Sequence, residues 1–186
     1  MDNHCAPSPR VLLVDDHPAV RQGLALLLSG EGLTVCAEAA SGADALALAC
    51  LHHPNLAIVD LSLDREDAMP LLSDLHQLRI PSLIYSMHND AWHVRAAFSA
   101  GALGYVTKQE FDEILLEAIR EVAARRRFLS PKAALALADG LPDPLAILSH
   151  HERRVFELLG HGEGAAEIAA LLNISTRTVE SYYERI

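Results

Sequence analysis

Short apolar runs and amphipathic stretches alternate along the first two thirds of this 186-residue chain. From Arg10 to about Arg127, five runs have the composition of buried strands, and helical stretches lie between them. The runs are VLLV (11–14), LTVCAEA (33–39), LAIVD (56–60), PSLIYS (81–86) and LGYVT (103–107). Continuous apolar strands that alternate with helices favour a parallel sheet that is covered on both faces.

The helical stretches repeat their apolar residues at the spacing of one helix face. A brief stripe of Val20, Leu24, Leu27 and Leu28 follows Pro18, and proline is favoured at helix starts. A longer stripe consists of Phe111, Ile114, Leu115, Ala118, Ile119 and Val122. Five strand–helix units predict an α/β, flavodoxin-like doubly wound domain with a five-stranded parallel sheet in the order 2-1-3-4-5. In that order ligands bind in a crevice at the carboxyl ends of strands 1 and 3.

The rest of the chain has a different character. Residues 128–147 read as a linker, with an alanine-rich helical piece before a GLPDP turn. Helices are predicted at 151–160, at 165–172 and from Thr176, where Ser175 can cap the third. The residues expected to face inward are Val155, Leu158, Leu159, Ile168, Leu171, Leu172, Val179, Tyr182, Tyr183 and Ile186. Two helices across a short turn have helix-turn-helix spacing, so we expect domains at 1–127 and 148–186, the second one small and all-α.

Polar residues stand where the predicted strands end. Asp15 and Asp16 follow the first strand and Asp60 ends the third, while Ser86 and Lys108 end the fourth and fifth. Each alone would be an ordinary turn, capping or loop residue. Three carboxylates at one edge of a sheet are costly unless a cation holds them together, and their formal charge cancels with one divalent metal and one lysine. Together these residues predict a Mg²⁺-dependent phosphoryl site.

The net charge of −10 is spread unevenly along the chain. Residues 1–127 carry 10 basic and 17 acidic side chains (−7), residues 128–147 add −1, and residues 148–186 carry 4 basic and 6 acidic side chains (−2). Neither predicted domain has the basic surplus that nucleic-acid binding usually shows, which counts against a DNA-binding function.

Cysteine, histidine and hydropathy patterns exclude several other classes. Cys5, Cys36 and Cys50 are odd in number and form no CxxC pair. We therefore expect buried free thiols, as in a cytosolic protein. The ten histidines are scattered, and the pairs at 52–53 and 150–151 lack a third ligand nearby, so no zinc site is expected. No apolar run could span a bilayer, and the N-terminus lacks the apolar core of a signal peptide. We therefore expect a cytoplasmic protein that does not bind membranes.

Motifs at the strand ends carry a family resemblance. With VDD at 14–16, VDLSL at 59–63, YSMH at 85–88 and GYVTK at 104–108, the first 127 residues resemble the receiver domain of two-component response regulators. The tail, LSHHERRVFELL…EIAALLNISTRTVE, resembles the LuxR-type helix-turn-helix output domain. The resemblance implies a transcription regulator that is not an enzyme, with a histidine kinase and promoter DNA as partners and a phosphorylation-dependent homodimer.

The resemblance also implies roles for the acidic residues. Asp60 would be the nucleophile that becomes an aspartyl phosphate. Asp16 would bind Mg²⁺ directly and Asp15 directly or through water, while the backbone carbonyl of Ser62 would complete the protein ligands. Hard oxygen ligands with retained waters are what Mg²⁺ prefers.

By the same resemblance, Lys108 would pair with the phosphate as a point charge. Ser86 would donate a hydrogen bond to the phosphate only after phosphorylation. That movement would vacate space into which the Tyr105 ring could turn, remodelling the face of strands 4 and 5 and so the dimer or the output domain. The loop after Asp60 departs from the MPxxDG pattern of many relatives, since the residues at 63–68 read LDREDA.

The third helix of the tail would contact DNA. The implied DNA-binding residues are Ser175, Thr176, Arg177, Thr178, Glu180, Ser181 and Arg185. Glu180 stands where a lysine is common in the family, and Tyr182 where a histidine is common. The sequence stops at Ile186 within this helix, which the family normally completes and follows with a fourth, so a truncated domain is expected.

Two other functions compete with this interpretation. The acidic tail and Glu180 favour a phosphorylation-switched regulator that acts through protein partners and has a weak or degenerate DNA-binding domain. A Mg²⁺ phosphohydrolase could also use Asp60 as its nucleophile. The hydrolase is disfavoured because the sequence has no sign of a cap domain or of a substrate pocket.

Overall fold

The computed structural model of the chain describes residues 9–63, 66–139, 148–160 and 162–183. The chain forms two compact units, Met1–Gly140 and Leu141–Ile186. Among the helices of the described residues, none combines the length and the apolar character needed to cross a membrane.

The first unit is built on a parallel sheet in the order β2-β1-β3-β6-β7-β8. Its strands are β1 (Arg10–Val14), β2 (Thr34–Ala39), β3 (Leu56–Val59), β6 (Ser82–Ser86), β7 (Gly104–Thr107) and β8 (Phe128–Leu129). The predicted doubly wound fold and the order of its five strands are confirmed, but the predicted strand number is wrong. Phe128 and Leu129 pair in parallel with Gly104 and Tyr105 and add a sixth strand at the edge.

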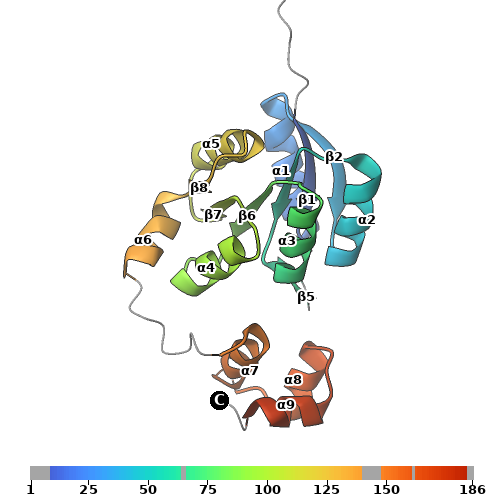
Figure 1. Cartoon of the computed structure of the whole chain (residues 1–186), viewed down its shortest axis with the longest axis vertical. Coiled ribbons are helices and arrows are strands. Elements are labelled where there is room, and N and C mark those ends of the chain that lie inside the picture. Colours follow the sequence, from blue (N-terminus) through green and yellow to red (C-terminus); the bar gives the residue numbers. More distant parts are fainter. Residues whose placement is uncertain (1–8, 64–65, 140–147, 161, 184–186) are drawn as a thin grey trace, which may run out of the picture. The chain divides into compact units, whose positions relative to one another are not determined.

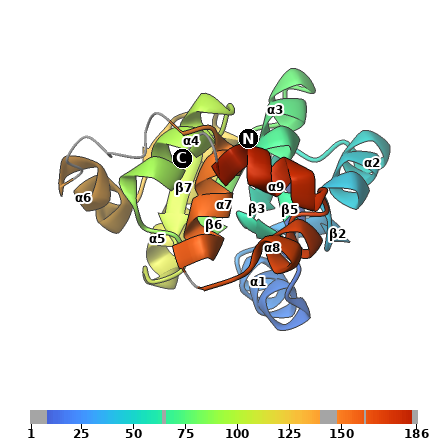
Figure 2. The same ribbon diagram turned by 90° about the horizontal axis from the view of Figure 1, so that it is seen from below.

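Within its described residues, the helices of this unit lie on the two faces of the sheet (Figure 1). They are α1 (Pro18–Gly30), α2 (Gly42–His52), α3 (Ala68–Gln77), α4 (Ala91–Ser99), α5 (Asp112–Ala123) and α6 (Pro131–Asp139). Of these, α6 lies beside α4 near the β8 edge. Figure 2 shows α3 and α4 on the side of the strands opposite α1 and α5. Alternate residues of each strand enter a different core: Leu13 packs toward α1 and α5, whereas Leu12 packs toward the remaining helices. Both sides of every central strand are therefore apolar, as the continuous runs predict.

Helix starts follow the local sequence. Pro18 begins α1 as predicted, and Ser41 accepts a hydrogen bond from the backbone of Asp44 at the start of α2. The prediction that Phe111 faces inward on α5 is wrong. This residue is the N-cap, has extended backbone angles, and leaves 79% of its surface exposed, so it precedes the helix whose face it was expected to share.

The segment after β3 forms a small antiparallel ladder of β4 (Ser62–Leu63) and β5 (Glu66–Asp67). Asp67 then caps α3, because its Oδ1 accepts a hydrogen bond from the backbone NH of Met69 at 3.0 Å. This is the loop whose sequence departs from the MPxxDG pattern. Within the described residues, the ladder and the cap order the two ends of this loop, at Ser62–Leu63 and at Asp67.

The second unit contains α7 (His150–Gly160), α8 (Ala165–Leu171) and α9 (Thr176–Tyr183). Val155, Ile168 and Val179, one from each helix, are fully buried at its centre. The expectation that Leu159 and Leu171 face inward is wrong, since both leave 37% of their surface exposed. Leu158, Leu172, Tyr182 and Tyr183 are partly buried against the core, whereas Ile186 lies outside the described residues. The turn between α8 and α9 completes the predicted helix-turn-helix.

Candidate functional site

The carboxyl ends of four parallel strands bring the predicted site residues together. Asp15 follows β1, Asp60 follows β3, Ser86 ends β6 and Lys108 follows β7. The backbone ladder continues past the strands, because Asp60 N donates to Val14 O at 2.8 Å and Lys108 N donates to Ser86 O at 2.7 Å. These hydrogen bonds fix the backbone positions of Asp60 and Lys108.

Lys108 lies between two buried carboxylates. Its Nζ donates to Asp15 Oδ2 at 2.7 Å and to Asp60 Oδ2 at 2.6 Å. Asp15 and Asp60 are only 3% and 4% exposed. Burial acts to lower the pKa of Lys108, but the hydrogen bonds and charges of the two aspartates outweigh it, so the pKa is raised above its usual value. The lysine is therefore charged at neutral pH, and one ammonium faces two buried carboxylates.

Asp16 adds a third carboxylate at the same edge. Its Oδ1 lies 2.7 Å from His17 Nδ1, and the backbone NH of His17 donates to Asp15 Oδ1 at 2.8 Å. On the other side, Ser62 N donates to Asp60 Oδ1 at 3.3 Å. Three carboxylates against one ammonium leave a formal charge of −2. The donor set is all-oxygen and carries the charge of one divalent cation, so the residues present fit Mg²⁺.

The two predicted switch residues are linked through a residue to which the sequence analysis gave no role. Tyr105 is completely buried, and its hydroxyl donates to the backbone carbonyl of His88 at 2.8 Å. The backbone NH of His88 donates in turn to Ser86 Oγ at 3.3 Å. Burial, followed by the charges of Asp90 and Asp60, raises the pKa of Tyr105 well above its usual range, so the hydroxyl remains a donor.

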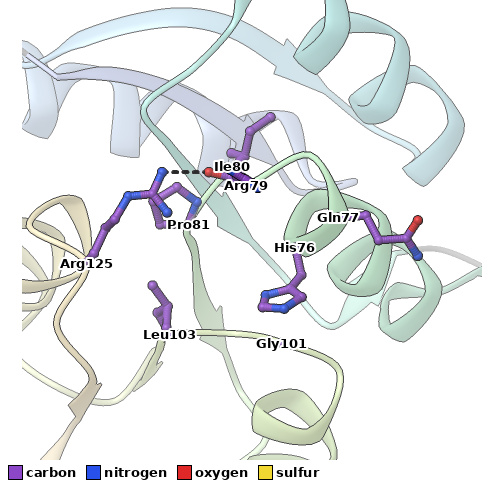
Figure 3. A pocket seen from close by; sticks show the side chains of 8 residues that line it. All are labelled: His76, Gln77, Arg79, Ile80, Pro81, Gly101, Leu103 and Arg125. Carbon is purple, nitrogen blue, oxygen red and sulfur yellow. Dashed lines mark hydrogen bonds between the residues drawn. The ribbon is translucent and has the colours of Figure 1, made fainter.

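A cavity of about 510 Å³ lies at the opposite edge of the sheet (Figure 3). Pro81 and Leu103, which precede β6 and β7, line it, and Arg125 donates a hydrogen bond across it to the backbone carbonyl of Arg79 at 2.8 Å. No carboxylate is among its lining residues. This cavity therefore plays no part in the chemistry of the aspartates.

In the second unit, Ser175 caps α9 as predicted, since its Oγ accepts from the backbone NH of Thr178 at 3.1 Å. Ser181 Oγ donates to Arg177 O at 3.0 Å and so lies against its own helix. Of the predicted DNA-binding residues, Ser175, Thr176, Arg177, Glu180 and Ser181 are exposed, Thr178 is half-buried, and Arg185 lies outside the described residues.

Several residues that surround the strand ends were not predicted from the sequence. His17 contacts two of the aspartates, and Arg21 donates a short hydrogen bond to the backbone carbonyl of Asp15. His88 Nε2 lies 3.2 Å from Ser62 Oγ, which connects the segments after β3 and β6. The short spacing of His88, Asp90 and His93 along the chain was the available signal for a further cluster of potential ligands.

Comparisons with known proteins agree with both units. Residues 11–120 match the family model of the response regulator receiver domain, and residues 146–186 match that of the bacterial regulatory proteins of the luxR family. The transcriptional regulatory protein UhpA of Escherichia coli K12 is 38% identical over 170 residues, which cover 91% of this chain and 85% of UhpA. The DNA-binding transcriptional activator DevR/DosR of Mycobacterium tuberculosis H37Rv is 35% identical over 187 residues, or 95% of this chain and 86% of the activator.

Solved structures give the same result. A LuxR-family two-component response regulator from Aurantimonas sp. SI85-9A1 superposes with a TM-score of 0.68 at 36% identity, over 71% of this chain and 96% of that one. The response regulator ChrA of a heme-sensing two-component system has a TM-score of 0.62 at 31% identity, over 97% and 89% of the two chains.

A receiver-type sheet with an acidic edge and a helix-turn-helix unit define a response regulator. The chain belongs to the LuxR family of response regulators, the transcriptional regulators of two-component systems, and carries a receiver domain and a DNA-binding domain.

Proposed function

We propose that Asp60 accepts a phosphoryl group from a histidine kinase and that Mg²⁺ is required for the transfer. The observation that carries this proposal is the bridge from Lys108 to Asp15 and Asp60, in which two buried carboxylates share one ammonium. Such an excess of buried negative charge is unfavourable by itself, and a bound divalent cation would offset it together with the negative charge that an incoming phosphoryl group adds.

In the transfer, a carboxylate oxygen of Asp60 attacks the phosphorus of a phosphohistidine on the kinase. The new O–P bond forms as the P–N bond breaks, and the electron pair stays on the imidazole nitrogen, which takes a proton from water. Lys108 Nζ lies 2.6 Å from Asp60 Oδ2, which supports the proposal that it would pair with the phosphoryl oxygens.

We propose that Asp15, Asp16, Asp60 and the backbone carbonyl of Ser62 hold the Mg²⁺ ion. When bound, the ion would supply the positive charge that offsets these carboxylates and the incoming phosphoryl oxygens. The burial of Asp15 keeps its carboxylate at a fixed place, with Oδ1 held by the backbone NH of His17.

Ser86 and Tyr105 are proposed to respond to the phosphate. Ser86 Oγ would exchange its bond with the backbone of His88 for a bond to the phosphate. That exchange would release the backbone NH of His88, whose carbonyl accepts the hydrogen bond from the Tyr105 hydroxyl, and so would loosen this segment. Because the two hydrogen bonds meet at one residue, Ser86 and Tyr105 would move together.

We further propose that residues 1–127 carry the phospho-acceptor function, that residues 128–147 connect it to the output domain at 148–186, and that phosphorylation promotes homodimerisation in the cytoplasm. The exposed start of α9, with Arg177, is proposed to contact promoter DNA. Exposed Glu180 on the same helix favours the second candidate, a regulator that acts through a protein partner.

The test uses the full-length protein and a small phosphodonor such as acetyl phosphate. Intact mass is expected to show one phosphoryl group per chain with Mg²⁺ and none with a chelator. The Asp60→Asn variant should remain unlabelled, whereas Asp74→Asn, an aspartate of α3, should label as the wild type does. Labelling that survives in Asp60→Asn would overturn the proposal.

A further inference from the structure

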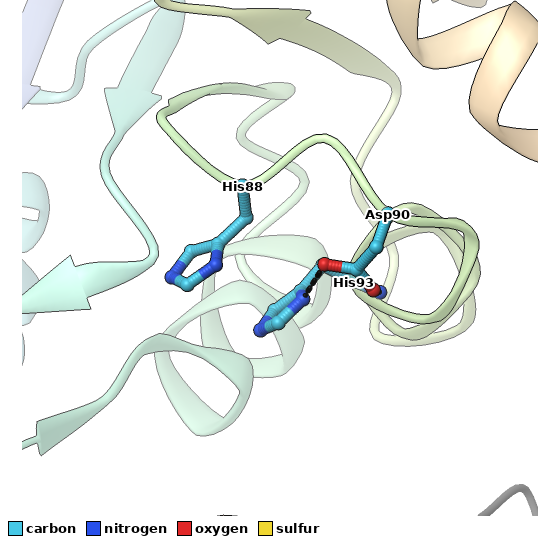
Figure 4. Close-up of side chains that lie close together, drawn as sticks. All are labelled: His88, Asp90 and His93. Carbon is cyan, nitrogen blue, oxygen red and sulfur yellow. Dashed lines mark hydrogen bonds and ion pairs between the residues drawn. The ribbon is translucent and has the colours of Figure 1, made fainter. Parts of the chain in front are cut away.

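A second cluster of potential ligands lies beside the acidic site, on the segment that joins β6 to α4. His88 and Asp90 belong to this segment, and His93 lies in the first turn of α4 (Figure 4). One ligand atom from each residue lies within 4.8 Å of the others. The cluster thus combines two imidazoles and one carboxylate, whereas the ligands proposed for Mg²⁺ at the acidic site are all oxygen atoms.

The contacts within the cluster are close. His93 Nδ1 lies 2.5 Å from Asp90 Oδ2, and the rings of His88 and His93 stack with their centroids 4.0 Å apart. The side chain of His93 is 13% exposed, and that of Asp90 is 45% exposed. The cluster therefore has a shielded inner part and an outer carboxylate that solvent and ions can reach.

We propose that His88, Asp90 and His93 bind a divalent transition metal ion of the Zn²⁺ type. Imidazole and carboxylate ligands suit Zn²⁺, and three protein ligands with water in the fourth position make a common coordination shell. Ligands at about 2.0–2.2 Å from one ion lie no more than about 4.4 Å apart, so side-chain rotations that turn the two stacked rings toward one ion bring these three into range. The ion replaces the proton between Asp90 and His93.

Backbone hydrogen bonds hold the carboxylate of Asp90 in a fixed position. Asp90 is the N-cap of α4, and its Oδ1 accepts hydrogen bonds from the backbone NH groups of Trp92 and His93, each at 3.1 Å. The partial positive charge at the start of a helix opposes a cation, but a full carboxylate charge at the same place outweighs it. Oδ2 remains directed toward the imidazole of His93.

Metal binding here would act on the segment that links the switch residues. The backbone of His88 donates to Ser86 Oγ and accepts from the Tyr105 hydroxyl. An ion bound to His88 and His93 holds this segment on α4 and so opposes the movement of Ser86. This consequence rests on the proposed function, whereas the metal site itself does not.

The single tryptophan of the chain is a built-in reporter for the site. Trp92 meets His93 edge-on, with ring centroids 4.7 Å apart. We would titrate the full-length protein with Co²⁺, a paramagnetic substitute for Zn²⁺, in excess Mg²⁺ and follow Trp92 fluorescence. Saturable quenching with one ion per chain is expected, and Zn²⁺ should reverse it by competition.

Two variants test the ligands. His93→Phe keeps a ring beside Trp92 and removes a ligand, and Asp90→Asn keeps a good N-cap and removes the charge. Both should weaken Co²⁺ and Zn²⁺ binding at least about tenfold, the scale on which the loss of a supporting contact acts at metal sites. The matched controls are His52→Phe, a histidine outside the cluster, and His17→Asn, which removes the imidazole beside Asp15 and Asp16.

The controls decide between the two clusters. Binding that is unchanged in both His93→Phe and Asp90→Asn, or that is lost in His17→Asn, would overturn the proposed site. For the link to the switch, Zn²⁺ should reduce Mg²⁺-dependent labelling by acetyl phosphate in the wild type but not in His93→Phe. Equal labelling of the wild type with and without Zn²⁺ would refute the proposed effect of the metal on the switch residues. A complete lack of labelling would instead count against the proposed function.

Discussion

Replacing Lys108 with methionine isolates the electrostatic cost of the acidic edge. Methionine keeps an unbranched apolar chain but removes the ammonium that lies 2.7 Å from Asp15 and 2.6 Å from Asp60. Both carboxylates then lose the same counter-ion. In the absence of Mg²⁺ the receiver unit is expected to be clearly less stable.

The structure sets the size of this effect. The side chain of Lys108 is 11% exposed and those of the two aspartates are 4% exposed, so the carboxylates are buried and the lysine beside them is half-buried. Removing one partner of a buried ion pair costs about 3–5 kcal/mol. We take about 3 kcal/mol, because the carboxylates lie at the edge of the sheet and can recruit water or protons. Domains of this size are stable by about 5–15 kcal/mol, so the variant should still fold.

Magnesium should recover part of the loss. A ligand at 100 times its dissociation constant stabilises the folded state by about 2.7 kcal/mol. Without the lysine, one positive charge less repels the ion, so Mg²⁺ should bind the variant more tightly and raise its stability by more than that of the wild type. Removal of the metal with a chelator should return the variant to its lower stability.

Urea unfolding followed by Trp92 fluorescence measures these differences in the first unit alone. The control is Lys132→Met, which changes the only other lysine of the chain, an exposed residue. It should shift the free energy of unfolding by less than about 0.5 kcal/mol. The reasoning is refuted if Lys108→Met unfolds within 1 kcal/mol (roughly the expected error) of the wild type without Mg²⁺, or if Mg²⁺ stabilises both proteins equally.

Three further changes test other parts of the molecule. Tyr105→Phe removes the bond to the buried carbonyl of His88 and should lower the free energy of unfolding by about 1–2 kcal/mol; an unchanged urea midpoint would contradict the hydrogen bond. Ile168→Ala empties the centre of the helix-turn-helix and should cost about 2–5 kcal/mol there, measured by far-ultraviolet circular dichroism, without moving the Trp92 transition. Arg177→Ala should weaken DNA binding and reduce its salt slope by about 1, whereas Arg154→Ala on α7 should not; equal slopes would argue against α9 as the DNA-contacting helix.

The sheet was predictable because its strands are short, continuous and apolar on both faces. Runs such as VLLV and LAIV correspond closely to β1 and β3, and the crossover rule gave their order. β8 was missed because it has only two residues, Phe128 and Leu129, directly after three arginines. Its pairing with β7 depends on how the chain folds in three dimensions, which a local sequence pattern does not show.

Helix faces were predictable except near helix ends. Leu115, Ala118, Ile119 and Val122 are buried on α5 as their spacing requires. Phe111 continues the same spacing but precedes the helix, so its side chain leaves the stripe. A periodic pattern does not mark the residue at which the backbone becomes helical, and the same limitation explains Leu171 at the end of α8.

The acidic edge was predictable from one rule, that parallel strands present their carboxyl ends at one edge of the sheet. Its internal contacts were not. Lys108 is 93 residues from Asp15 and 48 from Asp60, and only the folded chain shows that its ammonium touches both. The cluster of His88 and His93 was missed for a similar reason. It depends on the start of α4, which Asp90 caps, and on the stacking of the two rings in the folded chain.

The most decisive measurement is the position of the phosphoryl group after labelling with acetyl phosphate and Mg²⁺. Borohydride reduction converts an aspartyl phosphate to homoserine, which peptide mass mapping locates. Homoserine at position 60, absent when Mg²⁺ is omitted, is the expected result. Homoserine at position 15 or 16, or at none of the aspartates while Mg²⁺ is present, would contradict the assignment of Asp60 as the phospho-acceptor.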